Sequence, residues 1–185
     1  MPSKRRPPLE PTRRLAKIDA PRLANVYKRQ RLFKQLHEHS TGRVIWVSAP
    51  PGSGKTTAVA SWLQARPKRV IWYQCDEGDA DIASFFHFLT LALADYSNAD
   101  AVAMPSLSPE LHCALPTFVR NYFREFYARL TAPTVLVLDN WQDIPADAPL
   151  RELLPVIIEQ IPASTLLRSQ PSLPTRKLYA SLLKR

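Results

Sequence analysis

The segment Ala49-Pro50-Pro51-Gly52-Ser53-Gly54-Lys55-Thr56 decides the fold of this chain. It follows apolar residues 44–47, which have the character of a buried strand, and it precedes residues 57–65, which are compatible with a helix. Strand, glycine-rich turn and helix is the order in which a P-loop binds phosphate. Gly52 and Gly54 allow a sharp turn that points consecutive N–H groups inward, and the helix adds the positive end of its dipole. The segment therefore predicts a phosphate-binding loop.

Single residues of this loop have predicted roles. Lys55 is expected to reach the terminal phosphates, and the Thr56 hydroxyl is expected to join a Mg²⁺ shell. The strict pattern has glycine where this chain has Ala49, a small change because later residues form the cradle. A Gly/Ser turn that merely precedes Lys-Thr is the alternative, and the flanking strand and helix disfavour it. The predicted nucleotide contacts are Pro51, Gly52, Ser53, Gly54, Lys55, Thr56 and Thr57.

Composition favours a globular protein with a real core, since the 185 residues are 45% apolar. No apolar run approaches the roughly 18 residues of a membrane span. Basic residues at the N-terminus are not followed by an apolar stretch, so they do not form a secretory signal. Cys75 and Cys113 have no metal-binding spacing, which favours a reducing compartment and a cytoplasmic location.

The net charge of +9 is concentrated at the two ends of the chain. Residues 1–31 hold ten Lys or Arg against Glu10 and Asp19, and the last ten residues hold four more basic side chains. Charged, proline-rich tails are usually solvated. We therefore expect a flexible tail over residues 1–18 and a folded domain over residues 19–185. Nucleic-acid binding through the basic ends is an alternative, although no recognition motif accompanies them.

Apolar periodicity predicts an α/β fold, a three-layer P-loop NTPase with a mostly parallel sheet and helices on both faces. A strand fragment at residues 164–167 follows the last predicted helix, which contains Pro155. The predicted helices span residues 27–38, 57–65, 82–96, 115–130 and 150–160, and the predicted strands span residues 43–48, 69–73 and 134–139.

An acidic loop, Asp76-Glu77-Gly78-Asp79, follows the strand predicted at residues 69–73. Loops at the carboxyl ends of strands face the ligand crevice in a doubly wound sheet. The alternative is that Asp79 and Asp81 begin the next helix, where negative charge is favoured.

A second chemical landmark is the apolar run of residues 134–138, which ends in Asp139. A buried strand of this kind delivers its carboxylate to the phosphate crevice, where it holds Mg²⁺ through water. Four apolar residues followed by an Asp occur by chance in many strands, so this pattern alone is weak evidence for a metal ligand. After a P-loop and two strand–helix units, however, they predict an ATP or GTP site.

With these motifs the chain resembles the NTPase module of the large ATP-binding LuxR-type transcription regulators, in the STAND class of signalling NTPases. The resemblance covers roughly residues 20–180. The features that carry it are the P-loop at residues 48–57, Trp72-Tyr73 leading into the acidic loop, Val137-Leu138-Asp139-Asn140-Trp141, a lead-in segment at residues 26–36, and Arg168-Ser169-Gln170-Pro171.

The resemblance implies that Lys55 and Thr56 contact ATP and Mg²⁺, that Asp139 contacts the metal, and that Arg168 senses the γ-phosphate. Regulators of this family use ATP as a switch for self-association, and they bind DNA through other domains, which these residues do not include. Asn140 stands where the family has a second acid and cannot accept a proton. We therefore expect ATP binding with weak or no hydrolysis to ADP.

The family's fourth strand lies between the P-loop strand and the strand that ends in Asp139. In this chain the corresponding apolar run is short, because Leu166-Leu167 meets Arg168 directly. Together with Asn140, this leaves a second hypothesis: a non-catalytic truncated module that associates with a full-length regulator.

Overall fold

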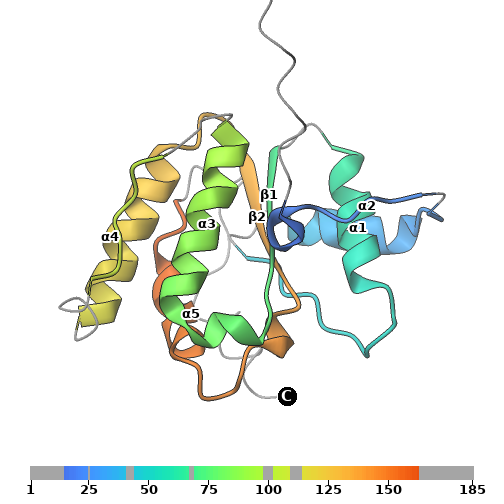
Figure 1. Ribbon diagram of the computed structural model, residues 1–185. Helices are drawn as coiled ribbons and strands as arrows, with labels where there is room; N and C mark the ends of the chain where they lie inside the picture. The colour runs from blue at the N-terminus through green and yellow to red at the C-terminus, as the bar shows by residue number, and fades with distance from the viewer. Residues whose placement is uncertain are drawn as a thin grey trace, which may run out of the picture.

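The computed structural model describes residues 15–24, 26–40, 44–66, 69–97, 102–108 and 114–162. Figure 1 shows the arrangement of the helices and strands. In chain order they are η1 (Ala16–Ile18), α1 (Gln30–His39), α2 (Lys55–Gln64), β1 (Arg69–Gln74), η2 (Glu77–Ala80), α3 (Ile82–Ser97), α4 (Leu115–Ala128), β2 (Thr134–Asp139), η4 (Trp141–Asp143) and α5 (Pro149–Glu159).

The two strands form a parallel pair in which Arg69 faces Thr134 and Gln74 faces Asp139. Helices α3, α4 and α5 lie on one face of the pair, and α1 and α2 lie on the other (Figure 1). The structure is therefore a mixed α/β fold with a small parallel sheet flanked by helices. The strands predicted at residues 69–73 and 134–139 are confirmed, as are the five predicted helices, with shifts of up to three residues at their ends.

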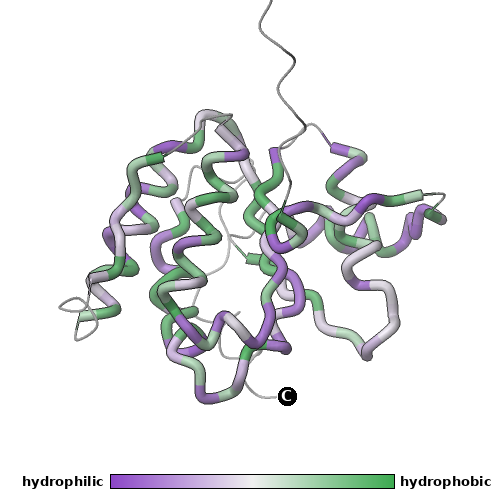
Figure 2. Tube along the Cα trace, in the orientation of Figure 1, coloured by the Kyte–Doolittle hydropathy of each residue, from purple (hydrophilic) through white to green (hydrophobic). Residues whose placement is uncertain are grey.

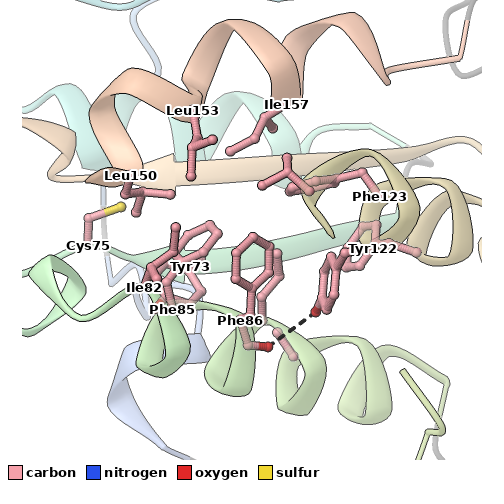
Figure 3. Close-up of a cluster of buried hydrophobic side chains, with 14 of the residues drawn as sticks. Tyr73, Cys75, Ile82, Phe85, Phe86, Tyr122, Phe123, Leu150, Leu153 and Ile157 are labelled. Atoms are coloured by element: carbon pink, nitrogen blue, oxygen red, sulfur yellow. Dashed lines mark hydrogen bonds between the residues drawn. The ribbon is translucent and has the colours of Figure 1, made fainter. Parts of the chain in front are cut away.

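The face covered by α3, α4 and α5 holds an aromatic core. Tyr73 of β1, Phe85 and Phe86 of α3, and Tyr122 and Phe123 of α4 are each at most 3% exposed (Figure 3). The rings meet mainly edge to face; Tyr73 and Phe85, for example, lie 5.1 Å apart between centroids. Since burial of one large apolar side chain contributes about 1.5–3 kcal/mol, this cluster supplies much of the folding free energy.

Sequence pattern explains the two helices that build this core. In α4 the buried residues recur at helical spacing from Phe118 to Phe126, while Arg120 and Arg124 are exposed. Figure 2 shows this mixture of hydrophobic and hydrophilic residues along the turns of α4. The start of α3 is capped by Asp81, whose carboxylate accepts hydrogen bonds from the Ala83 N–H at 3.1 Å and the Ser84 hydroxyl at 2.8 Å. The prediction that Asp81 begins a helix is confirmed.

The strand predicted at residues 43–48 is wrong for residues 44–48, which form no β-ladder among the described residues. A strand needs a hydrogen-bonded neighbour, and the expected neighbour, residues 164–167, lies outside the described part of the chain. Ile45 and Val47 still pack against the cluster formed by α2 and Trp72, whereas Trp46 is 46% exposed. Ile45 and Val47 are therefore partly buried by packing, although the segment does not pair with another strand among the described residues.

The end of the predicted flexible tail is packed in the structure. Lys17 of η1 pairs with Asp79 at 3.1 Å and with Asp76 at 2.6 Å. Asp79 is fully buried and also accepts hydrogen bonds from the Tyr73 hydroxyl at 2.6 Å and from the Asp76 N–H at 2.9 Å. A buried carboxylate needs such partners, because an unpaired charge in the interior is costly. Residues 1–14 lie outside the described residues.

Lys17→Met should lower the free energy of unfolding by about 3 kcal/mol, because it leaves a buried carboxylate without its cation. Urea denaturation followed by circular dichroism measures the change. The control is Glu125→Gln, which removes the partly exposed ion pair between Glu125 and Arg129 and should leave the midpoint nearly unchanged. Equal midpoints for Lys17→Met and the wild type would contradict a stabilising role for the buried pair.

Candidate nucleotide-phosphate site

The glycines of the P-loop adopt the backbone conformation that such a loop requires. Gly52 has φ 73° and Gly54 has φ 77°, both in the left-handed region that favours glycine. Gly54 directly precedes α2 and has no side chain with which to cap it, so the N-terminal N–H groups of α2 are available to an anion. The Ser53 hydroxyl is buried and has no hydrogen-bond partner among the described residues. An orphaned polar atom inside the loop fits a phosphate oxygen.

Lys55, the first residue of α2, arches back over the loop. Its ammonium group donates to the carbonyl oxygens of Ala49 at 2.8 Å and Pro50 at 3.3 Å. These are neutral acceptors, whereas a phosphate oxygen would pair the ammonium with an opposite charge. The Lys55 ammonium is therefore held at the P-loop by two of the loop's own carbonyl groups.

Thr56 and Asp139 meet although 83 positions separate them in the sequence. The Thr56 hydroxyl donates to Asp139 Oδ1 at 2.9 Å, joining the first turn of α2 to the end of β2. The same carboxylate oxygen accepts from the Asn140 N–H at 3.1 Å. The fold thus brings together the two side chains that the sequence predicts as metal ligands.

The donor set at this point suits Mg²⁺. A hydroxyl and one carboxylate are hard oxygen ligands, and Mg²⁺ usually takes one or two carboxylates plus phosphate oxygens and water. Within the described ranges there is no group of three or more His, Cys, Asp or Glu side chains that could hold a metal by itself. Thr56 and Asp139 fit a metal that arrives with a phosphate ligand.

Asn140 follows Asp139 in the left-handed conformation, with φ 57°. Asparagine tolerates this region better than most residues. Its side-chain oxygen accepts a long hydrogen bond, 3.5 Å, from the Gln142 amide. Asn140 is therefore placed beside the candidate metal ligand but carries no group that could take a proton from water.

A small cavity lies beside the P-loop, between the segment that precedes α1 and the first turns of α2. Its volume is about 210 Å³. Arg29 fixes one wall, because its guanidinium donates to the Ser53 carbonyl at 3.1 Å. Tyr27 is 86% exposed. The lining residues are Val26, Tyr27, Arg29, Phe33, Gly54, Thr57, Ala58 and Ser61.

Sequence reasoning predicted Gly54 and Thr57 as nucleotide contacts but missed the other residues that line this cavity. The signal available was a basic residue and an aromatic residue directly before an amphipathic helix, which also describes an ordinary solvated surface. Only the fold shows that this segment returns to the P-loop.

The acidic loop at residues 76–79 was predicted to face the ligand crevice, but two of its three acidic side chains have other partners. Asp79 points into the protein, where it binds Lys17 and Tyr73, and Asp76 caps η2 and pairs with Lys17. Burial and the hydrogen bond to Asp79 raise the pKa of Tyr73 well above its usual value, so the phenol stays protonated and donates. Glu77 is exposed.

Arg168, the predicted γ-phosphate sensor, and the strand fragment at residues 164–167 lie outside the described residues. So do the basic C-terminal residues that the nucleic-acid alternative requires. In the part of the chain that the structure describes, no helix is long and apolar enough to cross a membrane.

A comparison with known protein families gives a match over residues 27–168 to the AAA ATPase domain, a family of P-loop nucleotide-binding proteins. The match covers most of the chain, including the P-loop, β1 and β2. Nucleotide binding, typically with Mg²⁺, is the shared property of this family. The loop geometry and the family match agree, and the chain belongs to the AAA ATPase domain family of P-loop NTPases.

Proposed function

We propose that this chain binds ATP with Mg²⁺ as the signalling NTPase module of a LuxR-type transcription regulator of the STAND class, in the cytoplasm, and hydrolyses ATP slowly or not at all. The observation that carries the proposal is the hydrogen bond between Thr56 and Asp139 at the open N-terminus of α2. The finer assignment, to regulators and not to NTPases in general, rests on the resemblance carried by Trp72-Tyr73 and the acidic loop.

Each part of the site has a task in this proposal. The N–H groups of residues 52–57 and the Lys55 ammonium bind the β- and γ-phosphates, and Thr56 and Asp139 hold Mg²⁺. When bound, the metal neutralises phosphate charge and fixes the triphosphate geometry. The 210 Å³ cavity between Tyr27 and α2 is smaller than typical pockets for whole ligands. It suits a single aromatic base.

Lys55→Ala should weaken binding of Mg²⁺-ATP by about 30-fold or more, because a charge-assisted contact to phosphate is lost. Titration of the full chain with a fluorescent ATP analogue measures the dissociation constant, which we expect in the micromolar range for the wild type. Lys34→Ala on the exposed face of α1 is the control and should bind normally. Identical affinities of wild type and Lys55→Ala would remove the phosphate-site assignment.

Tyr27→Ala should weaken binding of ATP about 5- to 150-fold, since stacking of a base on an aromatic ring contributes about 1–3 kcal/mol. Binding of Mg²⁺-tripolyphosphate, which has no base, should stay unchanged. Competition against the same fluorescent analogue gives both constants, and the exposed Arg31→Ala serves as the control. A loss that is equal for ATP and tripolyphosphate, or no loss for ATP, would exclude the base cavity.

The weak-hydrolysis part of the proposal rests on Asn140. Replacing it with Asp restores a carboxylate where a base could orient water, and Asp tolerates the left-handed backbone. Asn140→Asp should raise ATP turnover at least tenfold with little change in ATP affinity. Asn140→Ser, which removes the amide without adding a base, is the control and should not raise it.

The second hypothesis, a non-catalytic module that associates with a full-length regulator, is favoured by the same residue and by the exposed side of β2. Residues 135–139 of β2 are all only partly buried, and β1 is the strand's single ladder partner among the described residues. Unchanged turnover in Asn140→Asp, together with intact ATP binding, would favour this hypothesis over a slow ATPase.

A further inference from the structure

Gln74 ends β1 directly beside the candidate metal ligand Asp139. The two residues are register partners in the parallel ladder. Paired residues of adjacent strands project to the same face of a sheet, and side chains alternate along each strand. Two positions earlier, Trp72 and Val137 both pack in the cluster with α2. Gln74 and Asp139 therefore belong to the face that carries the P-loop.

The opposite face confirms this orientation. Tyr73, between Trp72 and Gln74, is fully buried in the aromatic core with α3 and α4 (Figure 3). Leu138, its register partner, packs against the same core. Successive side chains of β1 therefore project to opposite faces of the sheet up to the end of the strand.

The Gln74 side chain is free to act on a ligand. It is exposed, and within the described residues its amide makes no side-chain hydrogen bond, whereas Asp139 is already bound to Thr56. Adjacent strands lie about 4.8 Å apart. A glutamine side chain on β1 can therefore reach a ligand bound at Asp139, either directly or through one water. Gln74 thus adds an uncommitted polar group beside Asp139, whose carboxylate is bonded to Thr56 at the end of the P-loop.

Two of the three acidic side chains that follow β1 are committed elsewhere, and the third, Glu77, is exposed. Asp76 caps η2 and pairs with Lys17, and Asp79 is buried beneath it. An amide also suits the position better than a carboxylate does. It donates and accepts hydrogen bonds without repelling a phosphate, and a glutamine amide orients the attacking water in other P-loop hydrolases.

We propose that Gln74 recognises the γ-phosphate of Mg²⁺-ATP, so that this site binds ATP more tightly than ADP. The inference rests on the proposed nucleotide site and adds to it a residue that distinguishes the two nucleotides. Such a difference in affinity is what a nucleotide switch requires, because a ligand shifts an equilibrium only by its differential binding.

The test compares dissociation constants of Mg²⁺-ATP and Mg²⁺-ADP for the full chain, measured by calorimetry. Gln74→Ala should weaken binding of ATP at least about tenfold, the lower end of the range for one hydrogen bond to a charged group, and should change binding of ADP by no more than about twofold. Gln74→Glu keeps the size but adds a negative charge, and it should weaken ATP further. Gln64→Ala, an exposed glutamine at the far end of α2, is the matched control and should leave both constants unchanged.

The failures of the two proposals are distinguishable. Loss of binding in Lys55→Ala with an unchanged ATP-to-ADP ratio in Gln74→Ala would reject the role of Gln74 and keep the nucleotide site. Equal losses for ATP and ADP in both Gln74 variants would also reject it, since they would indicate a general effect on the site. A wild-type chain that binds neither nucleotide would reject the proposed function and this inference together.

Discussion

The hydrogen bond between Thr56 and Asp139 is the contact on which the candidate site depends. It joins the beginning of α2 to the end of β2 at 2.9 Å, and the P-loop has no strand pairing of its own among the described residues. Packing of α2 against Trp72, Val135 and Val137 sets the distance between the helix and the sheet. The hydrogen bond aligns the first turn of α2 with the end of β2. Phosphate cradle and metal ligand are therefore positioned by a contact between two side chains together with a small apolar cluster.

The two faces of the sheet differ in how firmly they are built. The face of α3, α4 and α5 contains an aromatic core whose rings are almost fully buried. The other face is looser, because Trp46 is 46% exposed and the two buried side-chain polar atoms that lack partners in the described residues, Ser53 Oγ and Trp62 Nε1, both lie there. The larger buried core lies on one face, and the candidate nucleotide site lies on the other. A ligand bound to the looser face would stabilise the fold by mass action.

Much of the fold could be predicted from the sequence because local signals and burial agree. The apolar centre of β1, which is buried on both faces, the apolar run of β2 and the aromatic spacing of α4 are each compatible with only one kind of secondary structure. The P-loop turn was predictable for a similar reason, since Gly52 and Gly54 occupy positions with positive φ.

What the sequence could not supply was information about partners distant in the chain. Residues 44–48 have the apolar pattern of a strand, but pairing depends on a neighbour that their own sequence does not contain. Arg29 and Gln74 are ordinary polar residues until the fold places one against Ser53 and the other beside Asp139. Asp79 was predicted in a ligand crevice or at a helix start, and its actual partner, Lys17, lies 62 positions away.

The pairing of Lys17 with the acidic loop also has a consequence for the crevice. The three acidic residues of the loop after β1, at positions 76, 77 and 79, would place negative charge near a triphosphate and oppose its binding. Lys17 neutralises part of this charge, and Asp79 is turned into the core. Hydrogen bonds place the cations Lys55 and Arg29 and the carboxylate of Asp139 at the P-loop, and the uncharged Gln74 is the register partner of Asp139. That balance favours holding a Mg²⁺-bound triphosphate, while Asn140 offers no base with which to cleave it.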